Sequence, residues 1–202
     1  MPIKPGFIIR TILIFAVVYV PVLVSWIVLK QYYTWPVACS GAGLAAMTLD
    51  ADIDACTKVG QGIKVLFSRY LVTPAGVFPA HSGIIIDDNQ YTFNVPISLA
   101  MLIVTAMILR ITWSAWTKAL AALVIGHLMY VYACVLNQLE SYSIPAATKE
   151  IVSSPSIAIQ LFWDFCHTML IRFEPFLILS VLIFFHLANT AKRRNGTGQK
   201  RQ

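Results

Sequence analysis

The sequence predicts an all-α membrane protein with four transmembrane helices and a small external α+β cap between the first and second spans. Of its 202 residues, 58% are hydrophobic and only 12% are charged, and the mean hydropathy is +0.72. Soluble domains are closer to one half apolar and one quarter charged. The apolar residues also fall in long blocks rather than at amphipathic spacing, and the charged residues divide unevenly between successive segments.

Four apolar stretches predict the spans, because a transmembrane helix takes about 20 mostly apolar residues. They cover residues 7–29, 93–109, 119–137 and 175–188. The last stretch is short and follows another apolar segment, 156–173, which carries Asp164, His167 and Arg172. We expect residues 156–173 to form an interfacial or re-entrant helix that leads into the fourth span, with Arg172 and Glu174 as charges at its boundary.

The segment between the first two spans, residues 30–92, is too small to build an independent core without staples. Residues 44–58 favour helix, with Asp50, Asp52 and Asp54 in the early turns. The strings IIID (84–87) and YTFNV (91–95), separated by a polar turn, predict a hairpin. The chain then divides into an N-terminal span (1–29), the cap (30–92), two spans with a short inner loop (93–137), an outer loop with the interfacial helix (138–174) and the last span with its tail (175–202).

Basic residues predict the orientation. Four spans put both termini on one side, and that side carries nine basic residues and no acidic residue: Lys4, Arg10, Arg110, Lys118, Lys192, Arg193, Arg194, Lys200 and Arg201. The other side carries six basic residues and all nine acidic residues. The positive-inside rule then places both termini in the cytoplasm.

Five tryptophans are expected to anchor the chain at the membrane surfaces, because indole rings prefer the headgroup level. They are Trp26, Trp35, Trp113, Trp116 and Trp163. The partner that these residues predict is the lipid bilayer. The basic tail, which could suggest nucleic acid, lies next to a span and is expected to contact anionic lipid instead; no nucleic-acid partner is predicted.

Cys39 and Cys56 both fall on the predicted outer side, where thiols tend to oxidise. A disulfide between them is the first interpretation, and two free thiols are the second. The third is chemistry, in one of two forms. The string ACSG (38–41) resembles the active-site string of exosortases, although Gly43 stands where that family has arginine, and His167 with Arg172 would then be the nearest supporting pair. A disulfide oxidase would instead cycle the pair, and such enzymes relay between two cysteine pairs.

Other ionisable residues suggest no metal or cofactor. The run Asp50, Asp52, Asp54 begins like a calcium loop, but that loop needs glycine at its sixth position and glutamate at its twelfth. His127 lies inside the third predicted span, and a polar residue there calls for a functional hypothesis. His186 sits at a different predicted depth, so we expect a neutral His127 hydrogen-bonded between helices rather than a shared metal or haem.

The order of these parts resembles the small exosortase-associated membrane proteins of bacterial sorting systems, in particular the group that accompanies exosortase H. The resemblance is carried by DDNQYTFNVPISLAMLIV at the entry to the second span and by AIQLFWDFCHTMLIRFEPFLILSVLIFF at the end of the chain. It implies a multi-pass protein of the bacterial inner membrane, acting as a non-catalytic accessory or scaffold in envelope protein sorting or assembly, with another membrane protein of the sorting system as partner. The alternative is a membrane thiol enzyme, transpeptidase-like or a disulfide oxidase, that uses Cys39 and Cys56.

Overall fold

We describe the chain from a computed structural model. The structure describes residues 5–73, 76–141 and 156–198. Several residues of the charge argument, Lys4, Lys149, Lys200 and Arg201, lie outside the described residues.

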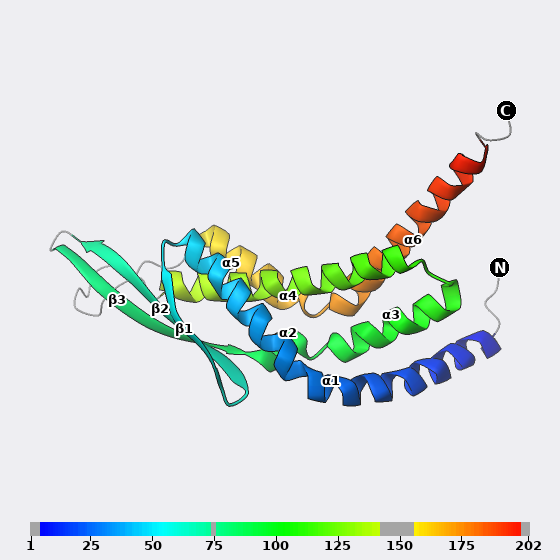
Figure 1. Cartoon of the computed structure of the whole chain (residues 1–202), viewed down its shortest axis with the longest axis horizontal. Helices are drawn as coiled ribbons and strands as arrows, with labels where there is room; N and C mark the ends of the chain where they lie inside the picture. Colours follow the sequence, from blue (N-terminus) through cyan, green and yellow to red (C-terminus); the bar gives the residue numbers. More distant parts are fainter. Residues whose placement is uncertain (1–4, 74–75, 142–155, 199–202) are drawn as a thin grey trace. The chain divides into compact units, whose positions relative to one another are not determined.

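Helices make up most of the described chain (Figure 1). They are α1 (Pro5–Thr48), α2 (Asp88–Thr92), α3 (Val95–Leu109), α4 (Trp113–Ser141), α5 (Ile157–Asp164), the π-helix η1 (Phe165–Leu170) and α6 (Glu174–Gly198). Four helical stretches in the described residues are long and apolar enough to cross a membrane: Ile8–Thr48, Asp88–Leu109, Trp113–Ser141 and Glu174–Ala191. Each overlaps one of the four predicted spans almost completely, and each is longer than the prediction.

Helix α1 exceeds its predicted span by more residues than any of the other spanning helices in the described chain. It has 44 residues, which corresponds to about 66 Å at a rise of 1.5 Å per residue, whereas the hydrocarbon core of a bilayer is about 30 Å thick. The predicted span ends at residue 29, where the apolar run gives way to Lys30, but the helix continues to Thr48. It ends there because Asp50 adopts a left-handed conformation (φ 49°) and the Ala51 amide donates to the Ala46 carbonyl, which closes the last turn.

A three-stranded antiparallel sheet follows, in the order β1 (Asp52–Val59), β2 (Gly62–Thr73) and β3 (Gly76–Asp87). Gly60, with φ 60°, opens the two-residue β1–β2 turn, where glycine tolerates a positive φ without a Cβ clash. Pro79 is accommodated because β3 is an edge strand. Alternate residues face the core, and Phe67 of β2 and Ile84 of β3 are each 1% exposed.

Two local predictions for this region are wrong. Residues 52–58 form a strand rather than a helix, because β2 supplies hydrogen-bond partners to β1 along its length, apart from an irregularity between Ile53 and Ala55. The strings 84–87 and 91–95 do not form a hairpin. Asp87 instead ends β3 and caps α2, accepting a hydrogen bond from the Asn89 amide, and the chain turns into helix.

The chain forms two compact units, and α1 and α4 contribute to both. One unit contains residues 1–29, 94–125 and 173–202, and the other contains residues 30–93 and 126–172, including the sheet. This division differs from the five segments predicted. The two units separate the charged residues as the two predicted membrane sides do, with one exception: the acidic residue Glu174 belongs to the first unit.

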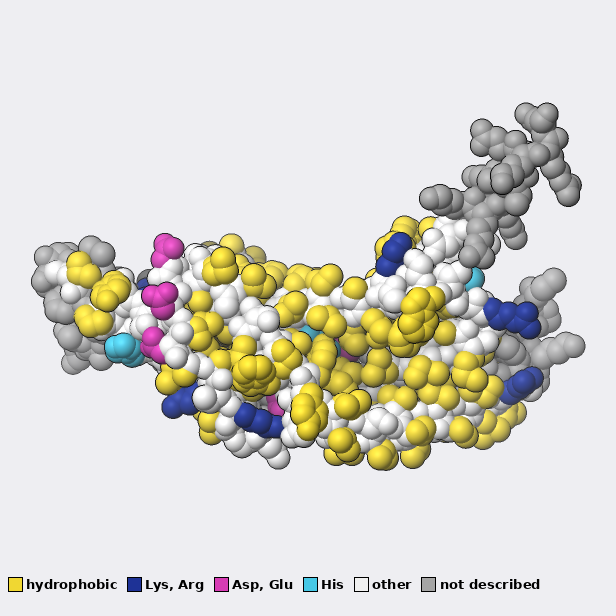
Figure 2. All heavy atoms as spheres, in the orientation of Figure 1, with side chains coloured by type: hydrophobic (Ala, Val, Ile, Leu, Met, Phe, Trp, Pro, Cys, Tyr) yellow, Lys and Arg dark blue, Asp and Glu magenta, His cyan; other side chains and the backbone are white. Residues whose placement is uncertain are grey.

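Helices α3, α4 and α6 supply the buried residues of the first unit, and Leu102, Ala115, Ala119 and Leu182 are fully buried there. Hydrophobic side chains are spread over the visible face of the molecule (Figure 2). On α1 the exposed ones include consecutive residues such as Ile8 and Ile9, and Val17 is 74% exposed. A helix that is apolar all round suits a lipid environment.

The sheet-bearing unit packs β2 and β3 with the second half of α1 and with α4. Small residues of α1 make the close approach possible: Ala38, Ala42 and Ala45 are fully buried, and a Cβ on Gly41 would lie 2.7 Å from Val131 Cβ of α4. Small residues at such spacing let two helix backbones come close together.

Candidate functional site

The polar contacts of the sheet-bearing unit converge on the short helix α2 and its neighbours. We call Asp88, Asn89, Gln90 and Tyr91 of this helix the α2 hub. Their side chains contact three other elements. They reach Lys30 and Thr34 of α1, Gln61 of the β1–β2 turn, and His127 and Tyr130 of α4. The hub therefore holds together elements that are distant in the sequence.

The polar end of the hub centres on Lys30. Its Nζ lies 2.9 Å from Asp88 Oδ1, and the Asp88 side chain is 5% exposed. The same ammonium group donates to Asn89 Oδ1, and Asn89 Nδ2 donates to Gln61 Oε1 over 3.3 Å. A carboxylate this deeply buried needs its cation, because removing one partner of a buried pair leaves an uncompensated charge.

The aromatic end of the hub is Tyr91, which is fully buried. Its hydroxyl donates to the Thr34 carbonyl over 3.0 Å. Its ring lies edge-on to His127 and stacked with Tyr130, with centroid distances of 5.7 and 5.8 Å. The hydroxyl and the ring thus fix α2 against both α1 and α4.

His127 lies between helices, as predicted. It is 1% exposed, and its Nδ1 shares a hydrogen bond of 2.6 Å with the Tyr33 hydroxyl of α1. His186, which the sequence places at a different depth, belongs to the other unit, and its Nδ1 has no hydrogen-bond partner among the described residues. The hydrogen bond between α1 and α4 is therefore confirmed, and Tyr33 is the partner that the sequence does not identify.

Tyr130 carries the aromatic contacts onward to the segment 157–170. Its hydroxyl donates to Gln90 Oε1 over 3.0 Å and lies 3.4 Å from His167 Nδ1. Trp163 lies 5.3 Å from the Tyr130 ring and stacks on His167 at 4.9 Å. The predicted helix of residues 156–173 is present as α5 and η1, and Ile171 closes η1 by donating its amide to the Cys166 carbonyl five residues back.

A disulfide joins Cys39 of α1 to Cys56 of β1, with their Cα atoms 6.1 Å apart. It confirms the first of the three interpretations of these cysteines. Trp35, one turn before Cys39, donates its indole N–H to the Cys56 carbonyl over 3.2 Å, so the helix and the strand are tied twice at the same point.

The structure places the residues of the enzyme alternative in separate local settings. Cys39 is bonded to Cys56, His167 contacts Tyr130 and Trp163, and Arg172 is exposed. The remaining thiols, Cys134 and Cys166, are buried. Burial raises the pKa of Cys166 to about 11, because the thiolate loses its hydration in an apolar setting.

The predicted anchors have varied surroundings. Trp113 is exposed and stacks on Trp116 at 5.5 Å, while Trp26 and Trp116 pack against the core of the first unit. Trp163 packs against the core of the second unit, next to the hub. Their depth in a membrane stays a prediction.

Glu174, predicted as a charge at the boundary of the last span, is the first residue of α6 and is buried. It is 5% exposed at the start of α6 and accepts a hydrogen bond of 2.7 Å from the Ser98 hydroxyl of α3. The N-terminus of a helix favours a carboxylate, which helps to explain its burial there. Arg172, the other predicted boundary charge, is exposed.

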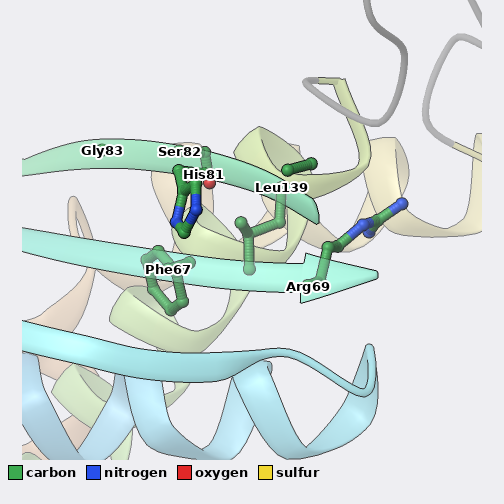
Figure 3. A pocket seen from close by; sticks show the side chains of 7 residues that line it. Phe67, Arg69, His81, Ser82, Gly83 and Leu139 are labelled. Carbon is green, nitrogen blue, oxygen red and sulfur yellow. The ribbon is translucent and has the colours of Figure 1, made fainter. Parts of the chain in front are cut away.

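A cavity of about 250 Å³ lies where β2 and β3 face the end of α4. Figure 3 shows its lining, with Phe67 and Arg69 from β2, His81, Ser82 and Gly83 from β3, and Leu139 from α4. Arg69 extends toward the end of β2, away from Phe67 (Figure 3). The lining combines the Arg69 guanidinium, the His81 imidazole and the Ser82 hydroxyl with apolar side chains.

The α2 hub is the feature that the sequence interpretation missed. Its available signal was the run of four polar residues, Asp87 to Gln90, immediately before an apolar span, because polar side chains at such a position are costly unless they are bonded. Within the described residues, no three His, Cys, Asp or Glu side chains come together in a way that could hold a metal ion.

In comparisons with known proteins, no family model matches the chain, and no curated protein or solved structure is similar to it.

Proposed function

We propose that this chain is a multi-pass protein of the bacterial inner membrane that serves as a non-catalytic accessory or scaffold in envelope protein sorting or assembly, beside an exosortase-like enzyme. The observation that carries the proposal is the Cys39–Cys56 disulfide. It uses the thiol on which both enzyme alternatives depend to tie a helix to a strand. The sorting partner is inferred from the family resemblance alone.

The outward face of the sheet supports a scaffold role. Tyr70 of β2 and Val77 and Ile85 of β3 are 74%, 61% and 60% exposed. The strand register puts all three on the face opposite Phe67 and Ile84, because side chains alternate along a strand. Exposed apolar residues on one sheet face suit contact with another protein, and we assign this face to the sorting partner.

The rival function requires a different state of the cysteines. A transpeptidase-like enzyme needs Cys39 as a free thiolate with a neighbouring base or cation. A disulfide oxidase needs the pair to be reduced and reoxidised in each cycle. A scaffold needs the bond only for stability, which for a loop of this length is about 3 kcal/mol in the chain-entropy model.

The first experiment measures the redox state of Cys39 and Cys56 in intact cells by acid-quenched alkylation and gel shift, with single Cys→Ser variants as references. The scaffold proposal predicts a fully oxidised pair that resists a mild reductant. A free Cys39 that alkylates rapidly at neutral pH would support the transpeptidase alternative. A mixed population that shifts with reductant would support the oxidase.

The second experiment tests the partner. A photo-crosslinking amino acid replaces Tyr70 on the outward sheet face, and the same group replaces Val17 of α1 as the control, in cells that express an exosortase-like enzyme. We expect a covalent adduct with that enzyme, identified by mass spectrometry, from position 70 only. Adducts of equal yield from both positions would contradict the assignment of this face.

A further inference from the structure

A surface groove of about 320 Å³ lies between α1 and β1 in the sheet-bearing unit. It is lined by Gln31, Tyr32 and Trp35 of α1 and by Lys58 of β1. The three α1 residues share one face of the helix, because Trp35 lies four positions after Gln31 and three after Tyr32. Lys58 follows Cys56 by two positions, so both side chains leave the strand on the same side, toward α1.

The two walls of this groove are fixed to one another. The Cys39–Cys56 disulfide joins them covalently, and the Trp35 indole N–H donates to the Cys56 carbonyl. The two backbone segments that carry the lining residues are therefore held together without a ligand, which lowers the entropic cost of binding.

The position of the groove along α1 indicates what it meets. No charged residue interrupts α1 between Arg10 and Lys30, and the apolar side chains of this stretch, such as Val17, are exposed up to Leu29 just before Lys30. Residues 7–29 extend about 35 Å along the helix axis, close to the thickness of the hydrocarbon core. The turn that begins at Gln31 then falls at the level of the lipid headgroups, which is where tryptophan and tyrosine concentrate.

The charges in and beside the groove select the ligand. Lys30, the nearest other cation on α1, is bound to Asp88 and Asn89. Lys58 is exposed, and among the described residues no carboxylate forms an ion pair with it. Lys58 is therefore a cation at headgroup level, next to an amide, a phenol and an indole that are all able to contact a polar lipid.

We propose that this groove binds the headgroup of an anionic phospholipid. The Lys58 ammonium pairs with the phosphate, Gln31 and Tyr32 donate to its oxygens, and the Trp35 ring packs against the glycerol region. The proposal rests on the membrane embedding in the proposed function but not on the sorting partner.

The test is native mass spectrometry of the purified full-length protein, released from detergent, with phosphatidylglycerol and phosphatidylcholine of identical acyl chains as probes. We expect tighter binding of phosphatidylglycerol, and a loss of about fivefold in that affinity for Lys58→Ala, the usual effect of one basic residue at an anionic surface. The matched control is Lys64→Ala, which removes the same charge from β2, outside the groove.

Two results would overturn the proposal. Equal losses for Lys58→Ala and Lys64→Ala would mean that general surface charge attracts the lipid. Equal affinities of the unchanged protein for the two lipids would mean that the groove does not select a headgroup of net negative charge. Alkaline extraction of membranes is run separately. Release of the chain would refute the membrane embedding, whatever the lipid result. If the chain is retained, a negative lipid result refutes only the lipid-binding groove.

Discussion

Replacing Gly41 by alanine tests the packing of α1 on α4 most directly. The added Cβ would lie 2.7 Å from both Cβ and Cγ1 of Val131 and 3.2 Å from the Leu128 carbonyl oxygen. Real Cβ atoms do not approach other atoms so closely, and the Cβ of a valine within a helix cannot move without its backbone. The helices must therefore separate, in a region where Ala38, Ala42 and Ala45 are fully buried.

The expected magnitude is the difference between two effects. Overpacking a filled core costs about 1–3 kcal/mol, and the short contacts to Val131 place this site in the upper part of that range. Alanine gains about 1 kcal/mol over glycine in a helix interior. We therefore expect Gly41→Ala to lower the free energy of unfolding by about 1–2 kcal/mol.

The chain offers a matched control two residues away. A Cβ on Gly43 of the same helix would meet only Ile53 Cδ1, at 4.0 Å, so Gly43→Ala should keep the gain in helix propensity and raise stability by up to about 1 kcal/mol. The assay is thermal unfolding of both variants in the same detergent, followed by near-ultraviolet circular dichroism. If Gly41→Ala is as stable as Gly43→Ala, the close approach of α1 and α4 is refuted.

Three further predictions concern the sheet-bearing unit. Asp50→Gly should raise the unfolding free energy by roughly 1 kcal/mol, because glycine adopts the positive φ of residue 50 without a Cβ clash; an unchanged melting temperature would contradict this. Tyr33→Phe should lower the free energy of unfolding by about 1 kcal/mol, because it removes the hydrogen bond between the Tyr33 hydroxyl and buried His127, whereas Tyr32→Phe, at an exposed residue, should have little effect in the same melt. Alkylation of Cys166 in the folded protein should accelerate about tenfold per pH unit up to about pH 11, because only the thiolate reacts and burial raises the pKa of this thiol. The rate is measured by peptide mass spectrometry, and a rate that stops rising near pH 9 would contradict the prediction.

The helices were predictable because apolar blocks of adequate length leave few alternatives to a spanning helix. Their ends were less predictable. Hydropathy places the end of the first span just before Lys30, but the helix continues because its later residues pack against α4 and the sheet. Gly41 and the neighbouring alanines allow this packing, but their role can be recognised only when the partner helix is known. Residues 52–58 show the same limit, since pairing with β2 decides their conformation.

The site was predictable in part. Two cysteines on the predicted outer side, separated by 17 positions, favour a disulfide, and a histidine inside a predicted span favours an interhelical hydrogen bond. The Tyr33–His127 contact joins residues 94 positions apart, and the Tyr91–Thr34 contact joins residues 57 apart. A single sequence carries no local signal for such pairings. Asp87 as the cap of α2, by contrast, had a local signature, an aspartate before a polar turn of helix, which the hairpin prediction overrode.

The α2 hub has a consequence for biosynthesis. The sheet is complete once Asp87 has been translated, but the α4 residues that cover the hub, His127 and Tyr130, follow about 40 positions later. At typical translation rates that interval lasts roughly 2–9 s. During it, the apolar face of the sheet lacks its α4 neighbours, whereas Cys39 and Cys56 have both already been translated. The disulfide is thus positioned to form first and to hold the nascent sheet against α1 until the rest of the chain arrives.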